Sequence, residues 1–375
     1  MSRTADTRRT DPPLKALARN AYRAANGIRA RVLGHAAAPG DAPAVWYGGA
    51  RAGDTGGPLV KVARLQAAFP EARGRFNLLY SLSNTPYLPR PALARLKARG
   101  VGIVHNQNGV FYPGWYGGDW KAQNARMADA YQLADHVFWQ SAFCRDCADE
   151  FLGARDGPGE VLFNAVDVTV FSPAPEPATG SRPFRFLLTG KIEGHLAYRL
   201  EDTIAGLAAA RSGGLDGELV VGGVLDEAAR AAAADAADRH GVRDRVRLAG
   251  PYTQADAPAL YRSADAYVMT KHADPCPNTV IEAMACGLPV AYVASGGVPE
   301  LVGPDAGSGV VPDGGDDWSR PFRPDADALG AAMTRVAENH AALSAAARAR
   351  AEEAFDLRTW LDRHRKVFDS LIERT

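Results

Sequence analysis

Residues 274–290 read DPCPNTVIEAMACGLPV and combine clear helix signals with two acids. The two prolines near the start cannot lie inside a regular helix, so the spacing predicts a helix that begins near Asn278, a good N-cap residue. Gly287 then ends the helix before a further strand. Because the first amides of a helix are unpaired and its dipole is positive there, this helix start is suited to bind a phosphate.

The two acids, Asp274 and Glu282, lie on either side of this predicted helix start. Glu282 shares a helix face with Asn278, four residues earlier. Amides hold phosphate and carboxylates hold sugar hydroxyls, so the pattern predicts a phosphorylated, hydroxyl-rich ligand. The alternative, an ordinary helix cap with a solvated glutamate, stays open at this point.

The composition narrows the class of protein. A chain of 375 residues is long enough for two domains, and its 43 basic and 43 acidic residues balance, so nucleic acid is not a favoured partner. Its four cysteines are too few for a disulfide scaffold, which predicts a reducing cytoplasm. Cys144 and Cys147 lack a second Cys/His pair at ligand spacing, so no zinc site is expected. No apolar run approaches transmembrane length.

Predicted strands and helices alternate along most of the chain, which indicates an α/β fold with parallel sheets covered on both faces. A proline-rich stretch over 173–182 reads as a linker between two Rossmann-like halves, with a ligand cleft at the carboxyl ends of the strands. We therefore expect four parts. They are a basic arm over 1–43, a first Rossmann-like domain over 44–178, a second Rossmann-like domain over 183–355 that holds the phosphorylated, hydroxyl-rich ligand, and a helix over 356–375 that returns to the first domain.

The arm has no apolar core of a signal peptide, but residues 14–33 show a helical pattern. One side of this helix would be apolar, and a row of cations would follow at a spacing of four residues: the apolar residues are Leu14, Leu17, Ala18, Ala21, Ala25, Ile28 and Val32, and the cations are Lys15, Arg19 and Arg23. A basic amphipathic helix of this kind suits an anionic membrane surface. The alternative is a helix packed on the first domain or left disordered.

Four loops carry candidate ligand groups. Gly190 and Lys191, followed by Arg199, suit a diphosphate at the end of a strand. A glycine-rich loop over 48–57 allows close backbone approach but does not match the dinucleotide fingerprint. The remaining two are a predicted polar loop over 105–109, suited to sugar recognition or proton handling, and the paired glycines within 295–300.

Taken together, the block 274–303 resembles glycosyltransferase family 4, whose members have the GT-B fold of two Rossmann-like domains. The matching residues are Asp274-x7-Glu282, the run AMACGLPV that follows, and GGVPELVG over 296–303. Weaker matches are FNAVD over 163–167, FSP over 171–173 and QSAFC over 140–144. The run NQNGVFYP over 106–113 is similar to a subgroup that assembles bacterial surface polysaccharide.

The resemblance implies a role for each candidate residue. Glu282 would bind the ribose of a nucleotide-sugar, Asp274 the hydroxyls of the transferred sugar, and Lys191 with Arg199 the diphosphate. His105 would lie near the reacting carbon. Further donor contacts would come from Gly57, Gly190, Asn278 and Thr279, and from the backbone around Pro251; acceptor contacts would come from Asn106 and Asn108. Two departures are Asp274, where the family usually has Glu, and the wide spacing of the basic pair.

The resemblance thus predicts a retaining hexosyltransferase that uses a UDP- or GDP-sugar and a glycan or lipid-linked acceptor in surface polysaccharide or lipopolysaccharide biosynthesis. Neither a cofactor nor a metal is implied. We expect a cytoplasmic protein that sits peripherally on the inner face of the membrane. Two alternatives stay open, an inert nucleotide-sugar-binding scaffold and a dinucleotide-dependent oxidoreductase, although the missing fingerprint disfavours the second.

Overall fold

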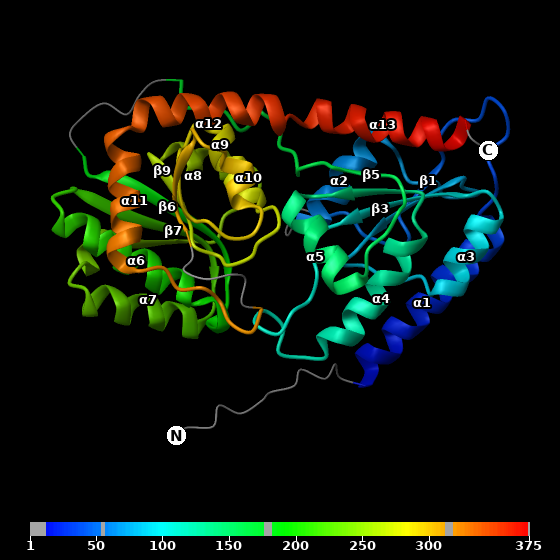
Figure 1. The fold of residues 1–375 in the computed structure, drawn as a ribbon, viewed down its shortest axis with the longest axis horizontal. Coiled ribbons are helices and arrows are strands. Elements are labelled where there is room, and N and C mark those ends of the chain that lie inside the picture. The colour runs from blue at the N-terminus through cyan, green and yellow to red at the C-terminus, as the bar shows by residue number, and fades with distance from the viewer. Residues whose placement is uncertain (1–12, 54–56, 176–181, 312–317, 374–375) are drawn as a thin grey trace. The chain divides into compact units, whose positions relative to one another are not determined.

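The computed structural model describes residues 13–53, 57–175, 182–311 and 318–373, which form two compact units (Figure 1). Unit 1 comprises residues 1–162, 317–321 and 361–375, and unit 2 comprises residues 163–316 and 322–360. Each unit is built on one parallel sheet with helices between the strands. The α/β architecture predicted from the alternation of strands and helices is therefore confirmed.

The sheet of unit 1 has five parallel strands in the order β1-β2-β3-β4-β5, which is the order of the chain. The strands are β1 (Val45–Trp46), β2 (Leu78–Leu82), β3 (Gly102–Gln107), β4 (His136–Trp139) and β5 (Gly159–Val161). Their side chains are mostly buried on both faces, as expected of a covered parallel sheet.

Five helices follow the strands or precede them in unit 1. They are α1 (Pro13–Leu33), α2 (Gly57–Ala68), α3 (Arg90–Ala98), α4 (Trp120–Leu133) and α5 (Ala142–Leu152). Asp119 caps α4 by accepting a hydrogen bond from the Ala122 amide at 3.0 Å, and Ser141 caps α5 in the same way through Cys144. Cys144 and Cys147 are buried on α5, where they pack as small apolar residues.

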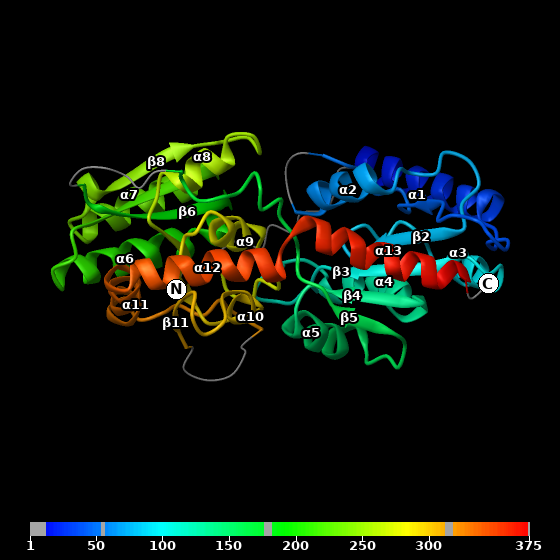
Figure 2. The same cartoon turned by 90° about the horizontal axis from the view of Figure 1, so that it is seen from above.

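Two segments from later in the chain complete unit 1. Figure 2 shows α13 (Leu357–Glu373) lying across the sheet, where His364 contacts Tyr80 and Phe138 and where Phe368 meets the Tyr80 ring. The second is the short segment 318–321. Its Trp318 carbonyl accepts a hydrogen bond from the Gly114 amide at 2.6 Å.

The sheet of unit 2 has six parallel strands in the order β11-β10-β9-β6-β7-β8. The strands are β6 (Phe184–Ile192), β7 (Gly217–Leu225), β8 (Val246–Gly250), β9 (Ala266–Met269), β10 (Val290–Val293) and β11 (Gly307–Val310). After β6, the strands β7 and β8 lie on one side of it, and β9, β10 and β11 then lie on its other side. The order therefore reverses between β6 and β9, and ligands of open parallel sheets bind at such a switch point.

Alternate residues of these strands face two separate cores. Leu187, Tyr267 and Val290 lie in one core and Phe186 and Val268 in the other, as a two-residue period requires. The first core is closed by α8 (Ala257–Arg262), α9 (Asn278–Ala285), α10 (Val298–Val302) and α12 (His340–Ala354), and the second by α6 (Tyr198–Ser212), α7 (Glu227–Arg239) and α11 (Ala326–Glu338). These layers can be followed in Figure 1.

Two details of the sequence-based prediction are corrected here. The alanine-rich run over 325–353 predicts one long helix, but the structure divides it into α11 and α12 at Asn339, whose backbone leaves the helical region with φ −107° and ψ 19°. The chain also enters unit 2 at residue 163, ahead of the linker predicted at 173–182. The reason is that Asn164 and Val166 already bond to Cys276 and Phe355 of unit 2.

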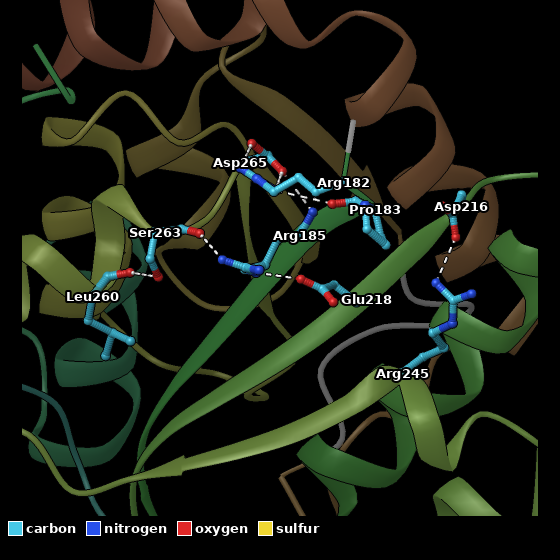
Figure 3. Close-up of polar contacts among 9 residues, drawn as sticks. All are labelled: Arg182, Pro183, Arg185, Asp216, Glu218, Arg245, Leu260, Ser263 and Asp265. Carbon is cyan, nitrogen blue, oxygen red and sulfur yellow. Dashed lines mark hydrogen bonds and ion pairs between the residues drawn. The ribbon is translucent and has the colours of Figure 1, made fainter. Parts of the chain in front are cut away.

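A set of ion pairs holds the amino ends of the strands in unit 2 (Figure 3). Arg182 binds both oxygens of Asp265 at 2.6 and 2.7 Å, and Arg185 donates to Glu218 at 2.5 Å and to the Ser263 carbonyl at 2.8 Å. Such forked arginine contacts fix geometry as well as charge. Because each carboxylate drawn in Figure 3 is paired with an arginine, we assign this end of the sheet to stability. A ligand site is expected at the opposite, carboxyl end of the strands.

Candidate functional site

At the switch point of unit 2, a glycine and an arginine meet at the carboxyl end of β6. Gly190 has φ +147°, a backbone conformation that side chains rarely permit. A Cβ at this position would lie 3.2 Å from Nη1 of Arg199, which comes from the first turn of α6. The sequence expectation that these two residues share a site is therefore consistent with their geometry.

Arg199 is a buried cation. Its side chain is only 4% exposed, its Nη2 donates to the Thr189 carbonyl at 3.2 Å, and its buried Nε has no partner. Within the described ranges, no carboxylate forms an ion pair with it. Burying a charge without an opposite charge is costly, so such positions are usually completed by an anionic ligand. Among the described residues of unit 2, Arg199 is therefore a candidate anion-binding group.

Glu282 lies in the middle of α9 and is 4% exposed. Its Oε2 accepts a hydrogen bond from the Tyr261 hydroxyl at 3.0 Å. Tyr261 in turn lies 3.3 Å from the hydroxyl of Thr189, which is 3.0 Å from that of Tyr267. A chain of hydroxyl groups therefore connects Glu282 with the end of β6, the strand that carries Gly190.

The tyrosine side chains near Glu282 keep their protons. Burial raises the pKa of Tyr261 well above its usual value, and the negative charge of Glu282 adds to the effect. Burial likewise raises the pKa of Tyr252 to about 12. A phenol that keeps its proton donates a hydrogen bond, so these groups stabilise Glu282 as an acceptor for ligand hydroxyls.

The start of α9 carries no side-chain cap. Pro277 is the N-cap residue and Asn278 the first residue of the helix, so the prediction that Asn278 itself caps the helix was wrong by one position. Proline fixes its own φ and lacks an N–H, which favours it beside a helix start. The buried Oδ1 of Asn278 has no partner in the described part of the chain. The uncapped amides of Asn278 and Thr279 are thus open to an anion.

Asp274 lies in a tightly held turn. Ala273 has φ +49°, the only positive φ of a non-glycine residue among those described, and such strain concentrates at functional sites. The Asp274 carboxylate accepts from Lys271 at 2.7 Å and from the Cys276 amide at 3.1 Å. Gly296 passes so close that a Cβ there would lie 2.4 Å from the Asp274 carbonyl. The acid is fixed, and Lys271 neutralises part of its charge.

The other predicted donor residues are Lys191, Pro251 and Gly57. Lys191 is 71% exposed and its Nζ pairs with Glu193 at 3.0 Å. Pro251 is exposed directly after β8, next to Gly250 with φ +80°. Gly57 is the first residue of α2 in unit 1, while residues 54–56 of the same loop, including Gly56, lie outside the described residues. The structure therefore links Gly190 with Arg199, and Arg199 with Glu282 through Thr189 and Tyr261, whereas the Lys191 ammonium group pairs with Glu193.

In unit 1 the polar loop predicted to begin at His105 is instead the last part of strand β3, which runs to Gln107. His105 is completely buried, its Nε2 lies 2.9 Å from Oε1 of Gln107, and burial lowers its pKa to about 4. The expectation of an exposed loop residue is wrong, because β3 pairs with β4 as far as Gln107↔Trp139. The buried, neutral imidazole of His105 holds the side chain of Gln107 in place.

Lys61 is a residue that the sequence reasoning missed. It lies on α2, is 5% exposed, and its Nζ donates to Oδ1 of Asn106 at 2.6 Å and of Asn108 at 2.9 Å. Both predicted acceptor residues thus meet at one buried ammonium group. The signal in the sequence is a lysine inside the apolar run LVKV over 59–62, where an inward-facing cation needs a purpose.

An Asp-x-Asp stretch, at 325–327, occurs in the chain. Asp325 caps α11 by accepting from the Ala328 amide at 3.0 Å, so this stretch begins a helix. In the described ranges, no three His, Cys, Asp or Glu side chains gather as metal ligands would. None of the helices described combines the length and apolar character that a membrane crossing requires.

The burial of His105 leads to a prediction about pH. Its pKa is about 4 in the folded protein against about 6.5 when unfolded, so between these values the unfolded state binds more protons and stability falls as pH falls. The expected loss is roughly 3 kcal/mol between pH 7 and 4. Melting temperatures of wild type and His105→Gln should therefore converge as the pH falls. Parallel curves would contradict the assignment.

The comparison between variants is needed because Asp202 acts in the opposite direction. Burial raises the pKa of Asp202 to about 6, against the effect of Arg323, which binds it at 2.7 Å. The folded state therefore binds more protons between pH 4 and 6, and the contribution of Asp202 to stability increases as pH falls. The difference in melting temperature between wild type and His105→Gln isolates the contribution of His105, because Asp202 contributes equally to both.

Comparison with known proteins identifies a glycosyltransferase segment mostly within unit 2. Residues 208–351 match the family model described as glycosyl transferases group 1. Unit 2 carries a group 1 glycosyltransferase segment. The segment includes Asp274 and Glu282, and it begins after Gly190 and Arg199.

Curated relatives match over part of this segment. The chain is 35% identical over 108 residues to D-inositol 3-phosphate glycosyltransferase of Mycolicibacterium smegmatis, covering 28% of this chain and 25% of the relative. It is 41% identical over 106 residues to the enzyme of the same name from Salinispora tropica, covering 27% and 22%. The chain thus spans about a quarter of the length of these relatives.

Solved structures match over both units. Alr3699/HepE of Anabaena, in complex with UDP, has a TM-score of 0.59 at 18% identity and covers 84% of this chain and 82% of its own. Sucrose-phosphate synthase of Thermosynechococcus elongatus has a TM-score of 0.59 at 18% identity, with coverage of 84% and 77%. At these identities the likeness shows the fold alone. Together with the group 1 segment, it establishes the predicted GT-B fold.

Proposed function

We propose that this chain is a retaining glycosyltransferase that moves a hexose from a nucleotide-sugar to a glycan or lipid-linked acceptor in surface polysaccharide biosynthesis. The observation that carries the proposal is Arg199, a buried cation without a carboxylate partner among the described residues, at the switch point of the unit that carries the group 1 segment. UDP is the favoured nucleotide, because Alr3699/HepE was solved with UDP and with UDP-glucose.

Different groups of unit 2 would bind different parts of the nucleotide-sugar, according to their charge. Arg199 and the uncapped amides of Asn278 and Thr279 would hold the diphosphate, because each presents positive charge. Glu282 would accept hydrogen bonds from the ribose hydroxyls, supported by Tyr261. Asp274 would bind hydroxyls of the hexose. The exposed Pro251 segment would contact the base through its backbone.

The chemical step breaks the bond between the anomeric carbon and the diphosphate oxygen. The sugar gains oxocarbenium character and the leaving diphosphate gains negative charge. Arg199 and the helix amides stabilise this charge because they are already in place, and Lys191 adds to them once its ammonium group leaves Glu193. The acceptor oxygen attacks from the same face, and its proton passes to the leaving phosphate oxygen. The configuration at the anomeric carbon is then retained without a nucleophilic carboxylate.

The direct test uses the purified chain with UDP- and GDP-hexoses. A donor that binds the folded state should raise the melting temperature in proportion to the logarithm of its concentration. Mass spectrometry of the same mixtures, with lipid-linked or oligosaccharide acceptors, should then show a product one hexose heavier. If no nucleotide-sugar raises the melting temperature and no hexose is transferred, the proposal is wrong.

One observation favours the alternative of an inert nucleotide-sugar-binding scaffold. Asp274, predicted to hold the hexose, is already engaged by Lys271 at 2.7 Å. A scaffold would bind the nucleotide-sugar with the same thermal shift as an enzyme but would release neither free hexose nor transferred hexose. Donor hydrolysis in the absence of acceptor therefore separates the two functions.

On the acceptor side we expect Lys61 to matter more than its neighbours. Lys61→Met removes the ammonium group that gathers Asn106 and Asn108, so the acceptor KM should rise by about 10-fold or more while UDP binding is unchanged. The matched control is Lys366→Met, an exposed lysine on α13, which should leave both values unchanged. An unchanged acceptor KM in the Lys61 variant would remove unit 1 from this role.

A further inference from the structure

Helix α1 exposes an apolar stripe. Leu17, Ile28 and Val32 are 67%, 64% and 67% exposed, and Ala21 and Ala24 between them are exposed as well. At 3.6 residues per turn, these five residues fall within about one quarter of the helix circumference. They form a continuous band, called the α1 stripe below, and Figures 1 and 2 show the helix along the outside of unit 1.

The opposite side of α1 holds the helix in place with polar groups. The Tyr22 hydroxyl donates to the Gly49 carbonyl at 2.6 Å, and the Arg29 guanidinium lies over the Trp46 ring at 5.2 Å. Asn26 and Ala30 are buried on this side. The helix is therefore inverted relative to an ordinary surface helix, whose apolar side faces the core. The alternative of a helix packed on the first domain is therefore met for the described part of α1, which packs through this polar side.

The surroundings of the α1 stripe are positively charged. The sequence of α1 contains five cations and no acid, and that of α3, which packs beside it, contains three cations and no acid. Arg31, Arg95 and Arg99 are exposed, and Arg99 reaches the carbonyl of Gly34 just beyond α1 at 3.4 Å. Burial, with Arg126 and Arg19 nearby, lowers the pKa of Arg23. Arg90 and Lys97 of α3 pair with Asp129 and Asp135, so the remaining positive charge beside the stripe comes mainly from Arg31, Arg95 and Arg99.

Three occupants could cover such a surface, and the charge selects among them. A second copy would bring its own cations against these, which like-charge repulsion opposes. Residues 1–12 have the sequence MSRTADTRRTDP, with no large aliphatic residue after Met1 and with three further arginines, so they cannot match an aliphatic band. An anionic lipid bilayer provides both hydrocarbon for the stripe and phosphates for the cations.

We propose that the α1 stripe is a membrane-contacting surface that lies in the interface of an anionic bilayer. Leu17, Ile28 and Val32 enter the acyl region, and Arg31 with the α3 cations binds the headgroups. The inference deepens the proposed function, since it supplies the surface on which a lipid-linked acceptor is found. Binding to lipid does not require transfer to occur, so the two proposals can fail separately.

The test is flotation of the full chain with vesicles. Wild type should float with phosphatidylcholine vesicles that contain 30 mol% phosphatidylglycerol, and at least about 10-fold less with phosphatidylcholine alone, because each juxtamembrane cation adds to anionic binding. Leu17→Ser/Ile28→Ser/Val32→Ser should lower the bound fraction at least about 10-fold. The matched control, Val224→Ser/Val311→Ser, removes exposed aliphatic side chains elsewhere and should float like wild type.

A charge variant and a binding readout complete the design. Arg95→Gln/Lys97→Gln should weaken flotation with anionic vesicles only, and salt should weaken it in wild type. The UDP-induced thermal shift should be the same in the triple variant and in the charge variant as in wild type, since neither variant touches unit 2. Flotation of the triple variant at the wild-type level would overturn the proposal. So would a wild-type dimer in light scattering that the triple variant loses, because the stripe would then be an interface between copies.

Discussion

Replacing Arg199 with methionine should lower kcat/KM for the donor by about 10³-fold while leaving the melting temperature unchanged or higher. Removing one fixed group that stabilises the charge of a transition state costs about 10²- to 10³-fold, and here the ground-state diphosphate contact is lost as well. Stability should not fall, because Arg199 is buried with a single carbonyl partner and methionine removes a desolvated charge of similar length.

The control for this prediction is Arg182→Met. Arg182 forms a forked ion pair with Asp265 at the amino end of the sheet, so its loss should lower the melting temperature and leave kcat/KM unchanged. Steady-state kinetics, UDP titration calorimetry and thermal unfolding of both variants test the pair. The assignment fails if Arg199→Met unfolds several degrees earlier, or if it transfers hexose at the wild-type rate.

Replacing Glu282 with glutamine should weaken UDP binding by about 10²-fold with no change in the acceptor KM. The carboxylate is held by Tyr261 at 3.0 Å, and a hydrogen bond to a charged group contributes about 1.5–3 kcal/mol, equivalent to one to two powers of ten in affinity. Glutamine keeps the size of the side chain, so packing around α9 is preserved. Calorimetry with UDP and with uracil alone measures the effect on the ribose.

Tyr261→Phe is the matched control for Glu282. It removes the hydroxyl that donates to the carboxylate and leaves the carboxylate itself, so UDP binding should weaken by less than in Glu282→Gln. If uracil affinity falls in parallel with UDP affinity, Glu282 shapes the base site and the ribose assignment is wrong. If neither variant changes UDP binding, Glu282 is part of the core only.

Much of the fold follows from patterns local in the chain. The DPCPN turn and the glycine after the apolar run define α9 to within one residue of the observed Asn278 start, because proline and glycine act through their own backbones. The alternation of apolar strands with helices likewise predicts both sheets, because each strand and each helix is indicated by residues close together in the sequence. The division of α11 from α12 was not predicted, since Asn339 is a weak signal within an alanine-rich run.

The parts that could not be predicted depend on contacts distant in sequence. The pairing of Lys61 with Asn106 and Asn108 spans more than forty residues, and the chain of hydroxyls from Tyr261 to Thr189 spans 72. Contacts with Gly49 and Trp46 determine which side of α1 is covered, and the sequence of α1 alone does not reveal these contacts. A pattern shows that a helix is amphipathic, and only its neighbours show which side is covered.

The route of the backbone between the units has a practical consequence for building hybrids of related enzymes. Residues 317–321 and 361–375 belong to unit 1, although unit 2 comes before each of them in the chain. A single crossover at the proline-rich stretch would therefore join a foreign Trp318 to Gly114 and foreign His364 and Phe368 to Tyr80. A chimera that exchanges donor specificity must be spliced at four junctions, with 163–316 and 322–360 transplanted and everything else native.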